Sequence, residues 1–496
     1  MTGTTSELRR PRTRLAAALV ALAVLVGVAS VLTPDVTAVQ TEPVPEPVAS
    51  TELVCAVTTA TSALTSTVSA GVAPLPTVKD GLATLADLST EQTAEPLRIT
   101  APGQTVSRVI EGRSGPAMLA RATGSFAQGL GADQAIRSGQ GQTRGLAASP
   151  CARPVTDAWL VGGGSTAGRL TQVLLVNDDD RPAQVDLLVY GEAGPVAAPG
   201  ASGIVLPPGS RKQVRLDTLA PNQALVAVHA LARSGRIGIV GLDQEAVGLV
   251  PMGMSLIPPT EAGSRLVIPG VPAPVHYAAL ELLSPDGDTT VSLTLLTADG
   301  LVVPAGISTV QLEAGKVTAV NLNEALAGQP AGIVVRTDDG AEVVAGVEVG
   351  TGDTATLREK DATAPVPVLS APGIVVGLAG GALKHAVMLS APGAATKVAL
   401  ALYAPGASAP VWRRTISVPS GSLARVTIPV TTATASSTLV LTPLGGGQVY
   451  ASRQVTEAGR RGPMIALAPI FAQRASTLVP TVVSVPGSSV PGMSSR

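Results

Sequence analysis

One phrase recurs three times along this chain at constant spacing. It consists of an apolar strand, a turn that contains glycine and a second strand, and its turn glycines, Gly209, Gly315 and Gly421, follow one another at intervals of 106 residues. Upstream of each phrase, apolar residues occupy every second position. These segments begin at Val185, Val291 and Val398. Because alternation with a period of two is typical of a strand with one buried face, the chain contains three tandem β units.

Each unit has about seven short apolar segments separated by turn signals, the pattern of an immunoglobulin-like β-sandwich of ~100 residues. A β-propeller blade is shorter, roughly 40–50 residues, and three blades would be too few to close a ring. The composition agrees, since 53 glycines and 41 prolines disfavour long helices and only 2% of the residues are aromatic. We predict an all-β fold with three tandem Ig-like β-sandwich repeats of about 106 residues.

The repeats set the predicted domain boundaries. Residues 154–260, 261–362 and 363–462 form the three β-sandwich repeats. Residues 52–153 do not align with them, and we expect a small divergent β-containing segment there. Serine, proline and glycine are frequent in residues 463–496, which predicts an extended C-terminal tail.

The N-terminus carries a targeting signal. Residues 1–14 form a basic, cytoplasmic tail and are followed by an uncharged, largely apolar run within residues 15–33. This run is longer than the ~7–15 residues of a cleavable signal core and approaches the ~20 residues of a transmembrane helix. We predict a signal anchor in a single-pass membrane protein; cleavage near residues 36–38 is the alternative and would give a secreted protein. Either way the Pro-rich linker at 34–51 and the bulk of the chain are extracytoplasmic.

The chain has two cysteines, Cys55 and Cys151. Both fall on the predicted extracytoplasmic side, where thiols tend to oxidise. We predict a disulfide between them, with two buried free thiols as the alternative. Closing a loop of this length would stabilise the enclosed segment by up to ~4–5 kcal/mol.

No motif indicates catalysis, a cofactor or a metal. The three histidines, His229, His276 and His385, do not recur at one position of the repeat. The glycine-rich stretch Gly162–Gly168 lacks the Lys-Ser/Thr ending of a phosphate-binding loop and precedes a strand. The acidic turn Asp178–Asp180 offers hard oxygen ligands for calcium, but Asp is also favoured in tight turns. We predict no catalytic residue, no cofactor and no metal ion.

The aromatic residues are the candidates for ligand contact, because sugar-binding sites stack rings on exposed aromatic side chains. Trp412 precedes Arg413 and Arg414 and is the first candidate contact residue; Trp159 is the second. Exposure of these two tryptophans would favour glycan binding.

Two stretches resemble a known group of proteins. The segment Gly145–Gly164, which includes Cys151 and Trp159, and the later phrase Arg265–Pro272 are similar to an uncharacterised family of actinobacterial exported proteins, a domain of unknown function. The resemblance extends over roughly residues 50–480 and implies an N-terminal membrane segment and export, with no activity. In that family Pro-Gly commonly follows the first cysteine, whereas Ala56 follows Cys55 here.

The formal net charge is −1, and the only basic block is at the N-terminus, which excludes nucleic acid as a partner. We therefore expect a non-catalytic, extracytoplasmic interaction or scaffold protein of the bacterial cell envelope. Its expected partners are the membrane, through the N-terminal helix, and an envelope protein or a cell-wall glycan. A cell-wall glycan-binding protein is the alternative function, and an extracellular hydrolase is a lesser one.

Overall fold

A computed structural model describes the chain from residue 44 to residue 479 with short gaps, together with a few residues near the N-terminus. The described residues are 17, 20–24, 44–56, 64–89, 94–111, 116–141, 143–352, 359–459 and 462–479. Most of the predicted anchor at 15–33 lies outside them. Of the helices in the described part, none has the length and apolar character needed to cross a membrane.

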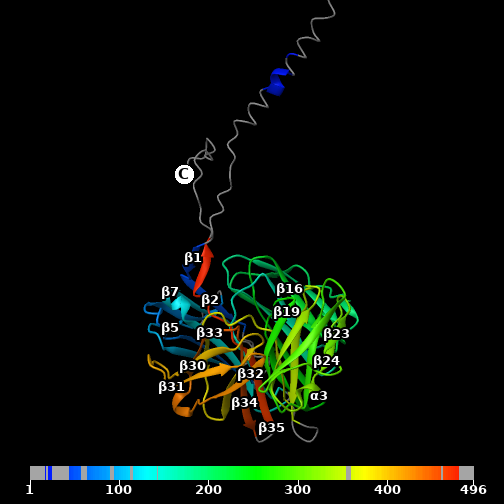
Figure 1. Cartoon of the computed structure of the whole chain (residues 1–496). Helices are drawn as coiled ribbons and strands as arrows, with labels where there is room; N and C mark the ends of the chain where they lie inside the picture. Colours follow the sequence, from blue (N-terminus) through cyan, green and yellow to red (C-terminus); the bar gives the residue numbers. More distant parts are fainter. Residues whose placement is uncertain are drawn as a thin grey trace, which may run out of the picture. The chain divides into compact units, whose positions relative to one another are not determined.

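The chain divides into two compact units, one made of residues 1–46 and 477–496 and the other of residues 47–476. In the first, β1 (Val44–Pro47) pairs with β36 (Ser476–Val479) in a two-stranded sheet. The second contains eight sheets of four or five strands, which pack in pairs as four β-sandwiches (Figure 1). The fold is therefore all-β, as predicted, but there are four sandwiches where the sequence indicated three.

The additional sandwich is formed by residues 50–150, where we expected a small divergent segment. Its sheets have the strand orders β2-β7-β4-β5 and β6-β3-β8-β9. The elements are β2 (Ser50–Cys55), β3 (Thr65–Val72), β4 (Gly81–Leu88), β5 (Leu97–Ile99), β6 (Thr105–Glu111), β7 (Ala117–Gly124), η1 (Ser125–Gln128), β8 (Leu130–Ser138) and β9 (Gly145–Pro150). Alanine, serine and threonine replace valine and leucine in several of these strands, so the alternation that marks the other units is weak here.

The second sandwich has the sheets β10-β16-β12-β13, with β14 also on β12, and β15-β11-β17-β18. The elements are β10 (Asp157–Val161), β11 (Arg169–Asn177), β12 (Ala183–Gly191), β13 (Gly194–Val196), β14 (Ile204–Leu206), β15 (Ser210–Arg215), α2 (Leu216–Leu219), β16 (Ala227–Ser234), β17 (Gly238–Val247) and β18 (Val250–Ile257).

The third sandwich has the sheets β19-β25-β21-β22, with β23 also on β21, and β24-β20-β26-β27. The elements are β19 (Arg265–Val271), β20 (Tyr277–Leu283), β21 (Thr289–Thr297), β22 (Gly300–Val302), β23 (Thr309–Leu312), β24 (Thr318–Asn321), α3 (Asn323–Leu326), β25 (Ala331–Thr337), β26 (Val344–Thr351) and β27 (Glu359–Thr363).

The fourth sandwich has the sheets β28-β33-β30-β31 and β32-β29-β34-β35. The elements are β28 (Gly373–Leu378), β29 (Leu383–Ala391), β30 (Thr396–Tyr403), β31 (Trp412–Val418), β32 (Ser422–Ile428), η2 (Thr432–Thr434), β33 (Ser437–Gly446), β34 (Tyr450–Gly459) and β35 (Gly462–Pro469). β35 belongs to this sandwich, so the predicted boundary of the tail at residue 463 is too early. Pro463 and Pro469 in this strand are the reason, because proline is typical of irregular segments.

All four sandwiches share one strand order. Counting β13–β14 and β22–β23 as one interrupted strand each, one sheet has the order 1-6-3-4 and the other 5-2-7-8. In an immunoglobulin domain the first strand pairs with the second, whereas here it pairs with the sixth. The predicted sandwiches are present, with a strand order that differs from the immunoglobulin one.

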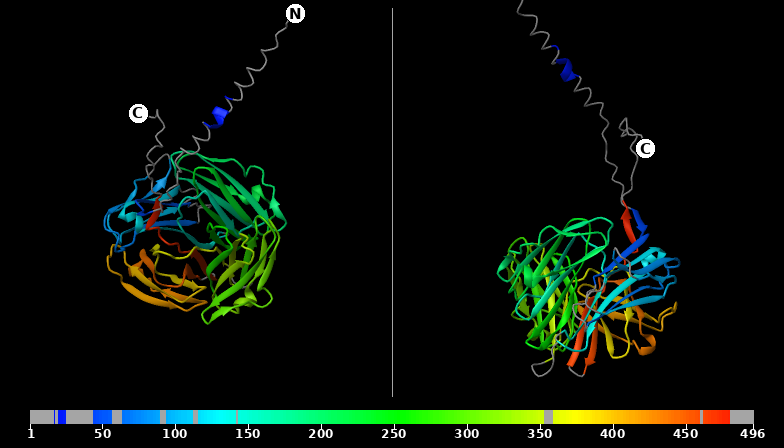
Figure 2. Two further views of the ribbon diagram at one scale, coloured as in Figure 1. Left: turned by 45° about the horizontal axis from the view of Figure 1, so that its top comes forward. Right: turned by 180° about the vertical axis from the view of Figure 1, so that it is seen from behind.

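Residues 47–476 form a closed ring of four sandwiches around their own last strands (Figure 2). β9, β18, β27 and β35 pack against one another at the centre of the ring. The ring closes because β28 of the fourth sandwich packs on β3 and β8 of the first. Buried apolar clusters cross each boundary between neighbouring sandwiches.

Each boundary also contains a glycine where an added Cβ would meet the neighbouring sandwich. The pairs of glycine and neighbour are Gly238 with Val54, Gly346 with Val161, Gly332 with Ser390 and Gly131 with Ile374. At Gly346 the added Cβ would overlap the carbonyl oxygen of Val161 and lie 3.0 Å from its Cβ. Because backbone cannot move aside as a flexible side chain can, close approach of the second and third sandwiches requires glycine at this position.

We expect Gly346→Ala to lower the free energy of unfolding by about 1–3 kcal/mol, because the added methyl group overpacks the boundary between the second and third sandwiches. The matched control is Gly287→Ala, where no heavy atom lies within 4 Å of the added Cβ. Chemical denaturation of both variants measures the difference. Equal stability of Gly346→Ala and the wild type would contradict the close contact.

Candidate functional site

The seventh strand of every sandwich carries a buried charged residue. These residues are Asp133 on β8, Asp243 on β17, Glu348 on β26 and Arg453 on β34. Strand pairing places each opposite a residue of the second strand of its own sandwich, namely Ser69, Thr171, Ala279 and Val387. The ring therefore holds charges at its internal boundaries, where apolar packing would be the default.

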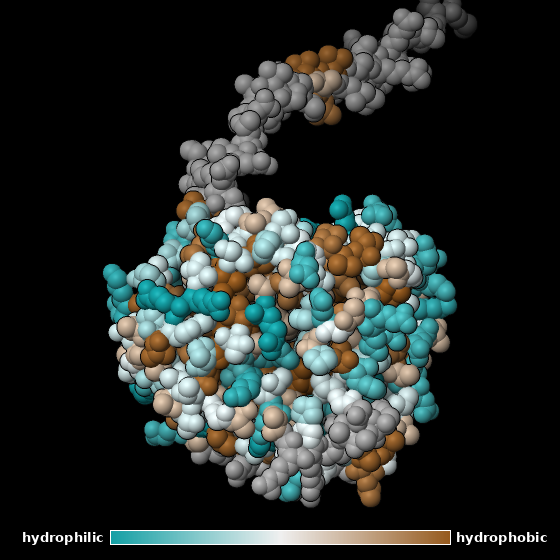
Figure 3. Space-filling model, turned by 60° about the horizontal axis from the view of Figure 1, so that its bottom comes forward, coloured by the Kyte–Doolittle hydropathy of each residue, from teal (hydrophilic) through white to brown (hydrophobic). Residues whose placement is uncertain are grey.

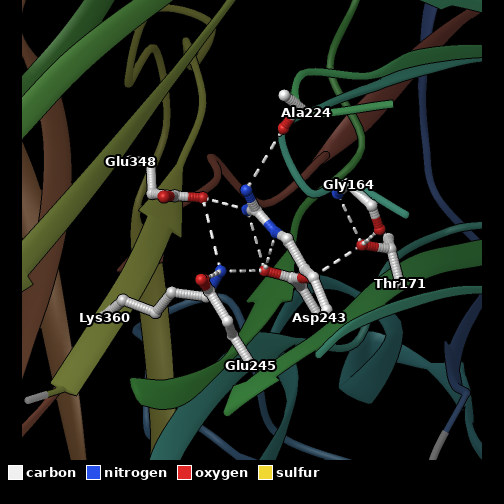
Figure 4. Close-up of polar contacts among 8 residues, drawn as sticks. Gly164, Thr171, Ala224, Asp243, Glu245, Glu348 and Lys360 are labelled. Carbon is white, nitrogen blue, oxygen red and sulfur yellow. Dashed lines mark hydrogen bonds and ion pairs between the residues drawn. The ribbon is translucent and has the colours of Figure 1, made fainter. Parts of the chain in front are cut away.

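The largest group of buried charges lies between the second and third sandwiches. We call it the charge cluster and define it as Arg169, Asp243, Glu245, Glu281, Glu348 and Lys360. β11 and β17 of the second sandwich supply Arg169, Asp243 and Glu245, while β20, β26 and β27 of the third supply Glu281, Glu348 and Lys360. Figure 4 shows Asp243, Glu245 and Glu348 converging on Lys360.

Two cations hold three carboxylates together across the boundary. Lys360 Nζ lies 2.5 Å from Asp243 Oδ2, 2.8 Å from Glu245 Oε2 and 3.6 Å from Glu348 Oε2. Arg169 Nη2 lies 3.0 Å from Asp243 Oδ2 and also pairs with Glu348. Asp243 and Glu348, one from each sandwich, therefore share both cations.

The glycine-rich stretch noted in the sequence packs against this cluster. Gly164 donates its backbone N–H to Thr171 Oγ1 at 2.8 Å, and the Thr171 hydroxyl donates to Asp243 Oδ1 at 2.6 Å. An added Cβ at Gly163 would lie 2.7 Å from Thr171 Cγ2, and one at Gly164 2.9 Å from Arg169 Cδ. The glycines thus let the backbone approach the cluster and orient one of its carboxylates.

The ion pairs fix the protonation of the central groups. Burial alone would raise the pKa of Asp243, but Arg169 and Lys360 hold that pKa well below its ordinary value. Burial alone would lower the pKa of Lys360, but Asp243 and Glu348 raise it above its ordinary value. Asp243 is therefore ionised and Lys360 protonated at neutral pH.

Glu281 is the exception within the cluster. Its side chain is 1% exposed, and neither carboxyl oxygen has a hydrogen-bond partner in the described part of the chain. Burial first, and then the nearby Glu348 carboxylate, raise the pKa of Glu281 to about 8. At neutral pH Glu281 is protonated, so it does not add a further negative charge to the group.

Other buried charges join sandwiches across the ring. Arg453 Nη2 of the fourth sandwich lies 2.5 Å from Asp133 Oδ1 of the first, and Asp133 also accepts the N–H of Val376 at 2.8 Å. Arg144 of the first sandwich pairs with Glu359 of the third at 3.2 Å, and both are almost completely buried. Buried hydrogen-bonded contacts therefore connect the first sandwich to two others.

This arrangement is a structural clasp between the second and third sandwiches. Arg169, Asp243, Glu348 and Lys360 are each at most 10% exposed and are already paired with one another. No group of three or more His, Cys, Asp or Glu side chains among the described residues is placed to hold a metal ion. A hollow of about 310 Å³ lies elsewhere and is lined by Leu88, Ser89, Pro116, Ala117 and residues 207–211, without a histidine or carboxylate.

The two predicted cysteines meet in the structure. Cys55 and Cys151 form a disulfide at the end of the first sandwich, with a sequence separation of 96 residues. This bond supports an oxidising, extracytoplasmic environment.

The two tryptophans differ in their exposure. Trp159 on β10 is 3% exposed, and one face of its indole is stacked on the His229 imidazole with 4.0 Å between ring centroids. A sugar ring has no access to it, so Trp159 does not serve as a contact residue; its apolar surroundings on an inner strand explain its burial. Trp412, at the start of edge strand β31, is partly buried against the fourth core.

The three histidines lie in different surroundings. His229 Nε2 lies 2.9 Å from Asp157 Oδ1, and no hydroxyl or thiol in the described part of the chain is bonded to the ring. Burial lowers the pKa of His385, whose Nε2 lies 2.6 Å from the carbonyl oxygen of Ala379. His276 is exposed. The structure does not bring these histidines together.

The charge cluster was missed in the sequence, although a signal for it exists. In three sandwiches the buried acid follows a glycine by two positions, as in Gly131-Ala132-Asp133, Gly241-Leu242-Asp243 and Gly346-Val347-Glu348. The buried Arg453 of the fourth sandwich follows Ala451-Ser452 and has no such glycine. An acid in the middle of an apolar strand, repeated in this way, indicates a buried charge that needs a partner.

A family model described as "Family of unknown function (DUF5719)" matches residues 106–429. The match begins in β6 of the first sandwich and ends just after β32 of the fourth, so it covers the second and third sandwiches and part of the first and fourth. A search of curated proteins finds no match to this chain.

Replacing Lys360 with methionine should lower the free energy of unfolding by about 3–5 kcal/mol, because Asp243, Glu245 and Glu348 would lose a shared cation inside the ring. The control is Lys316→Met, which breaks an exposed pair with Glu313 and should cost about 0–1 kcal/mol. Chemical denaturation compares the two, and similar losses would contradict the clasp.

The stability of the ring should fall as the pH rises from about 4.5 to about 8. The folded state keeps the proton of Glu281 up to about pH 8, whereas the unfolded state loses it near the ordinary pKa of 4.5, so the folded state binds more protons in this window. Glu281→Gln, a neutral variant of the same shape, should reduce this fall. The pKa of Asp243 is lowered, so this group titrates at a lower pH and does not change the stability between about pH 4.5 and about pH 8.

Thermal unfolding of the wild type and of Glu281→Gln at pH 5, 7 and 9 measures the effect. Burial also raises the pKa of Glu359 to about 8, so part of the slope remains in the variant. If the unfolding temperature of the two proteins fell equally with rising pH, Glu281 would be ionised in the folded state.

Proposed function

We propose that this chain, which belongs to the DUF5719 family of unknown function, is a non-catalytic interaction scaffold of the bacterial cell envelope. The N-terminal segment holds it at the membrane as a signal anchor, and the ring of sandwiches lies on the extracytoplasmic side. Its partner is another envelope protein.

The observation that carries this proposal is the use of the buried charges. Asp243, Glu348 and Lys360 bind one another across a sandwich boundary, as do Asp133 and Arg453, so these groups serve to hold the ring together. A reaction centre would instead need acid and base groups that face a substrate. A closed ring with internal cross-links is a rigid support on which turns and edge strands are available to partners.

The location rests on two independent features. The disulfide between Cys55 and Cys151 is typical of exported proteins, and a basic segment precedes an apolar run at the N-terminus. Both support export to the outer side of the membrane, with a single N-terminal span.

Binding of a cell-wall glycan is the second candidate function, and one residue favours it. Trp412 keeps part of its side chain at the surface on an edge strand, and the exposed Arg413 follows it. An aromatic face beside a guanidinium group is a combination that sugars and their acidic substituents bind. Trp159 does not contribute to this surface, because it is buried.

An affinity capture separates the two functions. The full-length chain, tagged at its C-terminus and solubilised from the envelope in mild detergent, is isolated with its bound material, and proteins and polysaccharides are identified in parallel. We expect enrichment of one or a few envelope proteins, unchanged by Trp412→Ala. Polysaccharide that is retained by the wild type and lost from Trp412→Ala would favour glycan binding, and an absence of both would contradict the scaffold.

A further inference from the structure

Charge is divided unevenly between the third and fourth sandwiches, although the whole chain has a formal net charge of −1. Residues 362–476 contain one acidic residue, Glu457, and nine basic ones. These are Lys384, Lys397, Arg413, Arg414, Arg425, Arg453, Arg460, Arg461 and Arg474. Residues 261–361 have the opposite bias, with 14 acidic and five basic residues. Neighbouring parts of one ring therefore carry opposite charge.

The fourth sandwich exposes arginines along one flank. We define the basic flank as Arg413 and Arg414 on β31 and Arg425 on β32; these strands are edges of the two sheets and contact each other. All three side chains are exposed, and none pairs with a carboxylate in the described part of the chain. The single acid of this sandwich, Glu457, forms an ion pair with Arg137 of the first sandwich, with 2.5 Å between Glu457 Oε1 and Arg137 Nη2.

The third sandwich gathers acids at one end. We define the acidic end as Asp286, Asp288, Asp338, Asp339 and Glu342, all of which are exposed. The Thr289 hydroxyl donates to Asp339 Oδ2 at 2.8 Å, which joins the turn after β20 to the turn after β25. Ala314 N–H donates to Asp288 Oδ1 at 2.8 Å and fixes this acid in its turn.

None of these five acids forms an ion pair within the described residues, and the nearby Lys316 is paired with Glu313. Nor do they form a metal site there, since no group of three or more acidic side chains among the described residues is placed to hold an ion. The basic flank and the acidic end also do not pair with each other inside the ring. Each remains open to a partner of opposite charge.

We propose that the basic flank of one copy binds the acidic end of a second copy, head to tail. Both halves of the contact are present on every chain, and a net charge close to zero does not hold two copies apart. A long polyanion on the basic flank would have to lie beside the acidic third sandwich, which disfavours it. On the face shown in Figure 3 apolar residues emerge in groups between hydrophilic ones.

The contact is heterologous, because two different surfaces meet. Every bound pair therefore keeps one unused basic flank and one unused acidic end, and further copies can be added. Copies held on one membrane would form rows. This inference does not depend on which envelope partner the chain has.

Charge reversal tests the contact on the full-length chain in detergent micelles. One variant carries Arg413→Glu and Arg414→Glu, and the other carries Asp338→Arg and Glu342→Arg, which spares Asp288 and Asp339 because these bond the turns. Sedimentation velocity measures self-association at ~50 mM and ~500 mM salt, because the Debye length differs several-fold between these concentrations. We expect the wild type to self-associate at low salt and each variant to lose at least about tenfold in affinity for itself.

The decisive sample is an equimolar mixture of the two variants. The first variant keeps its acidic end and the second keeps its basic flank, so the two variants should bind each other although neither binds itself. The reversed flank and the reversed end are again opposite in charge, so a chain with all four reversals should regain self-association. The matched control, Lys79→Glu with Arg98→Glu, reverses two exposed charges on the first sandwich and should associate as the wild type does. A wild type that stays monomeric at low salt, or a mixture that does not pair, would overturn the proposal. Binding of the basic flank to anionic vesicles or to a soluble polyanion in place of a second copy would overturn it as well.

Discussion

The structure depends on the placement of charged side chains inside a ring that is otherwise held by aliphatic packing. Asp243 of the second sandwich and Glu348 of the third share Lys360 and Arg169, and Asp133 of the first pairs with Arg453 of the fourth. The central strands β9, β18, β27 and β35 pack at the middle of the ring, and Asp243, Glu348, Lys360, Asp133 and Arg453 are buried there. An unpaired charge there would cost several kcal/mol, and each must therefore meet its partner in another sandwich.

Stability alone does not account for such groups, since apolar side chains of similar volume often stabilise a core as well or better. Buried charges add selectivity. An aliphatic face packs against any other aliphatic face, and the four sandwiches share one strand order, so several arrangements of the ring would bury similar apolar area. Lys360 requires carboxylates and Arg453 requires Asp133, which only one order of sandwiches provides. The buried charges of the seventh strands differ in sign, acidic for Asp133, Asp243 and Glu348 and basic for Arg453, and this difference specifies the neighbours.

The strands of the last three sandwiches could be predicted because each unit alternates aliphatic and polar residues and contains a glycine turn at a fixed interval. The first sandwich could be predicted only as a divergent β-containing segment joined by the disulfide of Cys55 and Cys151, since alanine and serine give β3 and β9 a weak pattern. The ring and its charge cluster could not be predicted from the sequence either. Arg169 and Lys360 come from different units, and a strand pattern does not reveal which faces of two sandwiches meet.

Trp159 illustrates the same limit. Its residue type suggested a contact surface, but its place on an inner edge strand, stacked on His229 beside the third sandwich, follows from packing between units. Arg413 and Arg414 are the opposite case. They lie on β31, which forms an outer edge of the ring, and no acid of the fourth sandwich is available to them because Glu457 is bound by Arg137. The closure of the ring therefore decides which charges are used inside and which are left at the surface for a partner.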